Sequence, residues 1–130
     1  MELTDAERLM LVKKKEEILE LTKHILEIVN RKSIKDQKED CLEVKKNITS
    51  ILSLLSTIGI YAKTKYNLDA LAKSAVLMTA GMHASGDNLY MHRISIEAFC
   101  HIVNSVDFKP TKRGVQIRIP KIDFTVFRKG

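Results

Sequence analysis

Three histidines at even intervals are the first residues of the chain that could bind a metal. His83, His92 and His101 are spaced nine residues apart. Nine residues correspond to about half a turn of phase on a helix, so His92 and His101 would face opposite sides. Helical ligands are usually three or four residues apart, as Glu97 and His101 are, but a pair without a third ligand is not a site. We therefore predict no metal site and interpret Glu97 and His101 as a surface pair.

The candidate nucleophiles lack the partners that catalysis requires. Cys100 falls on the apolar face of its predicted helix, where a cysteine is usually a buried thiol. Ser85 and His83 are too close in sequence to act as nucleophile and base, and no third group supports them. The carboxylates are spread along exposed helix faces, so no acid–base pair can be named. We predict a protein that is not an enzyme and has no cofactor; the enzyme alternative is a site assembled from His83, Ser85 and His101.

Residues 81–87 imitate the glycine spacing of a phosphate-binding loop. Gly81 and Gly86 have the required separation, but Asp87 occupies the position of the phosphate-binding lysine. No predicted strand precedes Gly81, and the aspartate would repel a nucleotide. The motif therefore fails.

The chemistry that remains is positive charge near the carboxy terminus. The chain has 22 basic and 16 acidic residues, a formal net charge of +6. Between Asp107 and Gly130 seven basic residues accompany two acidic ones, whereas the first 106 residues are nearly balanced. The seven are Lys109, Lys112, Arg113, Arg118, Lys121, Arg128 and Lys129. Clustered cations attract a phosphate backbone in a salt-dependent way, so we predict that these seven contact nucleic acid, RNA or DNA.

Two other interpretations of this basic segment remain open. Basic residues protect exposed strand edges against aggregation, so the segment could be a solvated edge. Its strand could also pair with the sheet of a partner protein. Only Phe127 is placed to stack on a base, so sequence-specific readout is not predicted. A second run of cations, Lys13–Lys15, is followed directly by two glutamates, and we interpret it as a solvated helix face.

The elements that must carry these residues are mainly helical. Residues 4–7 have the spacing of a capping box, which predicts a first helix that begins at Thr4. A tight turn near Asn30–Ser33 leads to a second helix, for which Ser33 is a candidate cap. Within that helix, Cys41–Ala62 has apolar residues at steps of three and four. We expect these two helices to form an antiparallel hairpin and the second to be the core helix on which the other segments pack.

Two more helices follow, and after them the spacing of apolar residues changes from that of a helix to that of a strand. Asn67 is expected to cap a third helix, which ends at a turn over Ser85–Asn88. A fourth helix follows, although Leu89–Ile96 also fits a strand. Lys109–Gly114 resembles a loop in composition, and 106–108 is a possible short strand.

Beyond the loop, apolar residues alternate with polar ones. Val115–Ile119 and Ile122–Val126 each have the period of a strand. Two strands are marginally stable alone, so they must pack on the helices or on another chain. We predict a single domain that consists of a helical body (1–106) and a small basic β-module (107–130).

Composition limits the class of protein. Of the 130 residues, 45 % are hydrophobic and 29 % charged, as in ordinary globular proteins. The longest uncharged stretch, Asn47–Ala62, is shorter than the ~20 residues that span a membrane. The polar amino terminus lacks the features of a secretory signal, and the two cysteines are isolated. We expect a cytoplasmic protein with neither a membrane partner nor a disulfide framework.

The basic carboxy-terminal segment and the lack of a catalytic motif favour the function of a non-enzymatic subunit. It would contact nucleic acid or a ribonucleoprotein surface through Asp107–Gly130, while its helical body docks on partner proteins or on copies of itself. In build, the chain resembles the small helical subunits of CRISPR interference complexes, which are compact, basic and non-catalytic. The alternative is a protein-interaction module whose helical hairpin dimerises and whose terminal strand adds to a partner sheet. Strand addition would respond little to salt.

Overall fold

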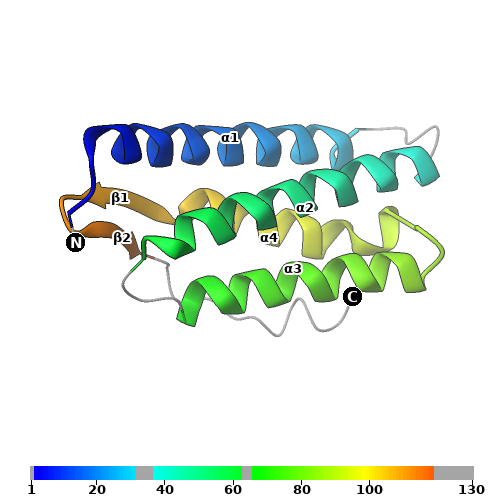
Figure 1. Ribbon diagram of the computed structural model, residues 1–130. Coiled ribbons are helices and arrows are strands. Elements are labelled where there is room, and N and C mark those ends of the chain that lie inside the picture. Colours follow the sequence, from blue (N-terminus) through cyan, green and yellow to red (C-terminus); the bar gives the residue numbers. More distant parts are fainter. Residues whose placement is uncertain (1, 32–36, 63–65, 119–130) are drawn as a thin grey trace.

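Four helices and a β-hairpin make up the computed structural model, which describes residues 2–31, 37–62 and 66–118. The elements are α1 (Asp5–Val29), α2 (Gln37–Ile60), α3 (Tyr66–Ala84), the short 3₁₀ helix η1 (Tyr90–His92), α4 (Arg93–Ser105), β1 (Asp107–Thr111) and β2 (Gly114–Arg118). Each α-helix runs antiparallel to the one before it, and the hairpin lies at the amino-terminal end of α1 (Figure 1). The prediction of a mainly α chain with an amino-terminal helical hairpin and a short carboxy-terminal β-hairpin is confirmed.

The first helix begins with the predicted capping box. The Glu7 amide donates to Thr4 Oγ1 at 3.1 Å, and the Thr4 amide donates to Glu7 Oε1 at 3.0 Å. The hydrogen bond from the Thr4 backbone, followed by that from its side chain, holds the pKa of Glu7 below its ordinary value. Two amides that the helix cannot satisfy are thus paired, which fixes the start of α1.

α1 has more neighbours than the sequence predicted. It packs against α2 and α4 along its length and against β1 near its start, whereas α3 packs mainly on α2. The expectation that all other segments pack on the second helix is therefore wrong, because α4 packs mainly on α1. The reason is a broad buried face that contacts two neighbours; its residues are Leu11, Ile18, Thr22, Ile25, Ile28 and Val29.

The core is aliphatic and follows the predicted apolar face of the second helix. Its largest fully buried side chains include Phe99 of α4, and the remainder are Ile, Leu and Met. On α2 the buried apolar residues are Cys41, Val44, Ile48, Ile51, Leu55 and Ile58, as the three-and-four spacing predicted. Full burial of each Ile or Leu contributes about 1.5–3 kcal/mol. No helix within the described ranges is long and apolar enough to cross a membrane.

Polar contacts join elements that are distant in the sequence. Thr22 Oγ1 of α1 lies 2.6 Å from Asn104 Oδ1 of α4. The guanidinium of Arg31, which follows α1, is 3.3 Å from the carboxylate of Asp40 in α2. Such contacts fix the relative positions of helices that apolar packing alone would leave freer to slide.

Several predicted boundaries differ from those of the structure. Asn67 is not the cap that precedes the third helix, because α3 already begins at Tyr66. The strand alternative for Leu89–Ile96 is wrong, since these residues enter η1 and α4. The turn over Ser85–Asn88 is confirmed, with φ +72° at Gly86 and +61° at Asp87. Ser33, the candidate cap of the second helix, lies outside the described residues.

The β-hairpin is tighter than predicted. Lys109, Pro110 and Thr111 belong to β1 and not to a loop, so only Lys112 and Arg113 turn the chain. The predicted strand Val115–Ile119 corresponds to β2, and the possible strand at 106–108 is the start of β1. The predicted strand Ile122–Val126 lies outside the described residues.

Candidate nucleic-acid interface

The hairpin that carries the predicted cations is hydrogen-bonded to the segment before α1 and to the segment after α2, which lie at the same end of the helical body (Figure 1). The Leu3 amide, just before α1, donates to the Lys112 carbonyl at 2.6 Å. The Val115 amide donates to the Tyr61 carbonyl at 3.0 Å, and Ala62 and Val115 form a parallel bridge just after α2. Two strands that would be marginal alone are therefore held on both sides by their own chain.

A glycine permits this close attachment. A Cβ atom on Gly114 would lie 2.6 Å from the Tyr61 carbonyl oxygen, closer than a carbon can approach, and the residue has φ +129°. Only glycine adopts this backbone conformation without strain. Gly114 thus sets both the turn of the hairpin and its distance from the end of α2.

Alternation along the strands determines which side chains face solvent. Phe108 and Val115 are buried in the core, where they continue the apolar surface begun by Val106. Successive side chains of a strand point to opposite faces, so Lys109 and its partner Gln116 are exposed. Packing of the apolar face therefore orients Lys109 towards solvent.

The tip of the hairpin presents two further cations in an ordered turn. Lys112 and Arg113 are exposed. Thr111 Oγ1 accepts a hydrogen bond from the Arg113 amide at 3.4 Å and donates to the Gly114 carbonyl at 2.9 Å. In the part of the chain that the structure describes, no carboxylate lies within 4.0 Å of Lys109, Lys112 or Arg113. Among the described residues, these three charges are therefore unpaired.

The structure brings together three of the seven predicted contact residues. Lys109, Lys112 and Arg113 share the hairpin. The backbone of Arg118 ends β2 opposite Asp107, while its side chain is outside the described part. Lys121, Arg128 and Lys129 also lie outside the described residues. The structurally defined interface is therefore the hairpin, which we call the basic hairpin and define as residues 107–118.

One neighbouring cation was not predicted from the sequence. Lys15 Nζ of α1 lies 4.0 Å from Asp107 Oδ1, so a residue of the lysine run at 13–15 adjoins the basic hairpin. The prediction of a solvated helix face for this run did not include that contact. No local pattern could indicate a contact between residues 15 and 107, because it depends on the packing of β1 against α1.

The evenly spaced histidines occupy separate environments. His83 and His101 are exposed, whereas His92 is buried. The predicted surface pair required Glu97 to contact His101. Instead, Glu97 Oε1 accepts a hydrogen bond from Arg93 Nε at 3.0 Å. Within residues 2–31, 37–62 and 66–118, no three His, Cys, Asp or Glu side chains are grouped as metal ligands.

Ser85 and His92 form a pair that the sequence did not suggest. Ser85 Oγ lies 2.9 Å from His92 Nε2 and 2.9 Å from the Met82 carbonyl. A serine hydroxyl that donates to the carbonyl must accept from the imidazole, which assigns the proton to Nε2. His92 Nδ1 is then buried without a hydrogen-bond partner among the described atoms. A catalytic triad needs a third group that hydrogen-bonds to this atom and orients the imidazole, so Ser85 and His92 do not form a triad. Their hydrogen bond instead connects the end of α3 to η1.

The two cysteines are also unsuited to nucleophilic chemistry. Burial, with a smaller contribution from the charge of Glu97, raises the pKa of the Cys100 thiol to about 12. Burial likewise raises the pKa of Cys41 above its ordinary value. Because the thiolate is the nucleophile, neither residue is activated for attack at neutral pH.

Comparison with known proteins yields no relative from which a function could be transferred. No protein-family model matches the chain, and no curated protein or solved structure is significantly similar to it. The function must therefore be inferred from the chain's own residues.

Proposed function

We propose that this protein is a non-enzymatic, cytoplasmic subunit that contacts the phosphate backbone of RNA or DNA through its basic hairpin. The observation that carries the proposal is the group formed by Lys109, Lys112 and Arg113. All three are exposed on one ordered hairpin, and no carboxylate among the described residues neutralises them. The proposal also includes the predicted contacts of the Arg118 side chain, Lys121, Arg128 and Lys129, which lie outside the described part.

The rigidity of the hairpin supports this assignment. Backbone hydrogen bonds from Leu3 and to Tyr61 fix the turn before any ligand arrives, so binding need not order the backbone. Cations contribute affinity through the release of counterions from the phosphates. No aromatic side chain is exposed on the described part of the hairpin, so the contact would be independent of sequence.

Strand addition, the mechanism of the protein-interaction alternative, receives less support from the described hairpin. β1 packs beside α1, and Pro110 has no amide to donate along its outer edge. On the other edge, the Val115 amide is already bonded to Tyr61. A partner strand would therefore find few hydrogen-bonding groups. Docking through the helical body remains compatible with the subunit role.

The test is fluorescence anisotropy with labelled single- and double-stranded oligonucleotides over a range of salt concentrations. The variant Lys109→Gln/Lys112→Gln/Arg113→Gln should bind more weakly to every sequence. Each phosphate contact contributes about 0.9 to the slope of log K against log salt, so the slope should flatten by at most about three units.

The control must separate local contacts from overall charge. Lys23→Gln/Lys38→Gln/Lys73→Gln removes the same charge from exposed positions on α1, α2 and α3. It should retain most of the affinity and slope, once circular dichroism shows that both variants are folded. Equal losses in the two variants would mean that net charge, and not the hairpin, is responsible.

A further inference from the structure

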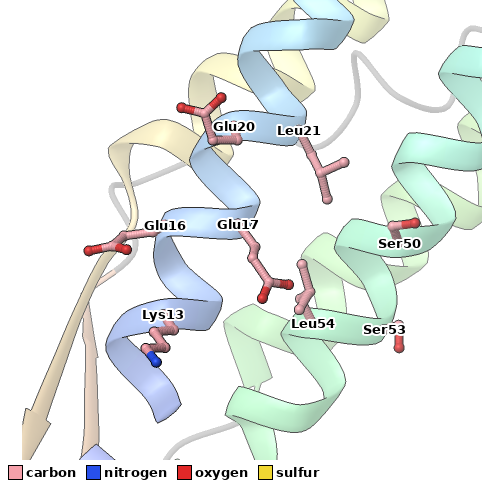
Figure 2. Close-up of a pocket in the computed structure, with 8 residues that line it drawn as sticks. All are labelled: Lys13, Glu16, Glu17, Glu20, Leu21, Ser50, Ser53 and Leu54. Carbon is pink, nitrogen blue, oxygen red and sulfur yellow. The ribbon is translucent and has the colours of Figure 1, made fainter. Parts of the chain in front are cut away.

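A groove between α1 and α2 is the second feature of the surface with a distinct charge. It has a volume of about 820 Å³ and is lined by Lys13, Glu16, Glu17, Glu20 and Leu21 of α1 and by Ser50, Ser53 and Leu54 of α2. Figure 2 shows Leu21 and Leu54 directed into the space between the helices, with the Glu17 carboxylate beside Leu54. The groove thus offers an apolar floor and the Glu17 carboxylate, while Glu16 and Glu20, at its α1 edge, point away from α2 (Figure 2).

The charge of this groove is opposite to that of the basic hairpin. Three glutamates and one lysine line the groove, although the chain as a whole is basic. The hairpin tip presents Lys112 and Arg113, and no carboxylate among the described residues pairs with them. One molecule therefore carries two complementary surfaces, an acidic groove and a cationic turn.

These two surfaces cannot meet within one molecule. The Lys112 carbonyl is bonded to the Leu3 amide, before the first turn of α1. Glu17 lies twelve residues beyond Asp5, which is about 18 Å along the helix axis. The hairpin is also bonded to Tyr61 and cannot swing across this distance without losing that contact. The complementary surfaces can therefore meet only between two molecules.

We propose that the hairpin tip of one copy of this chain docks in the α1–α2 groove of a second copy. The Arg113 guanidinium meets the Glu17 carboxylate, a geometry that permits two parallel hydrogen bonds. Lys112 lies at the α1 edge of the groove, on the side towards which Glu20 points, and the aliphatic stem of Arg113 covers Leu21 and Leu54 (Figure 2). Association is salt-dependent, because the ion pairs lie at a partly exposed surface.

The geometry of the contact determines how the assembly grows. Hairpin and groove are different surfaces, so the contact is head-to-tail and leaves one of each unoccupied in every dimer. Species larger than a dimer therefore form as the concentration rises. The inference is independent of whether the hairpin also binds nucleic acid.

The experiment is sedimentation velocity of the full chain at low and high salt over a range of concentrations. Wild type should associate at low salt and dissociate at high salt. Glu17→Lys, which reverses the charge in the groove, should be monomeric at both. Lys112→Gln/Arg113→Gln, which removes the charge of the hairpin tip, should also be monomeric.

An equimolar mixture of these two variants should form dimers, because each supplies the surface that the other lacks. Growth should stop at the dimer, since the two surfaces left over are an uncharged hairpin tip and a groove of reversed charge. Glu27→Lys is the matched control, an equal change of charge at an exposed site ten residues along α1. It should associate as wild type does.

Three outcomes would overturn the inference: a wild type that stays monomeric at low salt, a Glu27→Lys variant that loses association equally, or a mixture that remains monomeric. Thermal unfolding checks that each variant is folded, and Glu17→Gln supplies a milder change in the groove. Oligonucleotide binding by Glu17→Lys reports separately on the hairpin. Retained binding with no association in wild type would reject this inference and leave the proposed function standing.

Discussion

Asp87 combines an unusual backbone conformation with a contact across the helical body. Its φ of +61° allows its amide to donate to the Met82 carbonyl at 2.9 Å, which closes the end of α3. Its carboxylate accepts a hydrogen bond from Lys45 Nζ of α2. That hydrogen bond is the main reason that the pKa of Asp87 is held below its ordinary value, against the opposing effect of desolvation. The residue thus joins a turn to a helix more than forty positions earlier in the chain.

Replacement of Asp87 by asparagine should lower the melting temperature at pH 7 by several degrees. A carboxyl group whose pKa is lowered by folding stabilises the protein above its unfolded value of 3.8, and this contribution is lost as the pH falls through the folded value. The difference between wild type and Asp87→Asn should therefore shrink below about pH 4. Asparagine tolerates positive φ, so the backbone is not a second cause.

Thermal unfolding followed by circular dichroism at pH 7, 5 and 3 measures this difference. Asp69→Asn removes the same charge from an exposed position on α3 and should change the melting temperature much less. A deficit in Asp87→Asn that is as large at pH 3 as at pH 7 would show that the carboxylate is not the cause.

Residue-level prediction from the sequence succeeded where the contacts are local. The capping box joins residues three positions apart, so Thr4 and Glu7 could be paired from spacing alone. Lys45 and Asp87 are 42 positions apart, and Ser85 was compared with His83 although its partner is His92. The spacing of residues in the sequence does not show which turn will face which helix, so such contacts require the structure.

At the scale of elements, the hairpin shows how composition can misplace a strand. Lys109–Gly114 contains proline, glycine and three cations, which is typical of a loop. The structure accommodates Pro110 because it lies on an edge strand, at a position where its missing amide breaks no bond to β2. The alternation at Val115 and Ile117 was sufficient to predict β2, whereas β1 becomes evident only through its pairing with β2 and its packing against α1.

Gly114→Ala should damage the basic hairpin specifically. The new Cβ would require the strand to move away from the Tyr61 carbonyl, and positive φ adds strain of about 1–3 kcal/mol. Urea unfolding should therefore show a loss of at least this size. Anisotropy should show weaker oligonucleotide binding, because Lys112 and Arg113 are no longer held in position.

Gly86→Ala is the matched control, because Gly86 also has positive φ but a Cβ there would meet no atom within 4 Å. It should cost roughly 1 kcal/mol of stability and leave oligonucleotide binding unchanged. Equal effects of the two substitutions on binding would indicate that general destabilisation, and not displacement of the hairpin, weakens the interface.

At the scale of the whole molecule, opposite charges are separated onto two surfaces of a basic chain. The sequence alone shows that the excess positive charge begins at Asp107, because it follows from the numbers of basic and acidic residues. It did not predict the acidic groove, because the groove is lined by residues of both α1 and α2, which only the packing of these two helices brings together. The proposed nucleic-acid contact and the proposed self-association use the same two cations, Lys112 and Arg113.

Oligonucleotide and a second copy of the chain should therefore compete for the hairpin tip. By linkage, a ligand that binds the unassociated hairpin must weaken association by the same factor by which association weakens its own binding. Adding a short duplex to wild type at low salt should replace the larger species with complexes in which one chain occupies each duplex site, as measured by sedimentation.

The affinity for the duplex provides a second measurement. Glu17→Lys cannot self-associate through the groove, so its affinity should be independent of protein concentration. The apparent affinity of wild type should fall as the protein concentration rises. Assemblies that persist at saturating duplex would show that the two contacts use different residues.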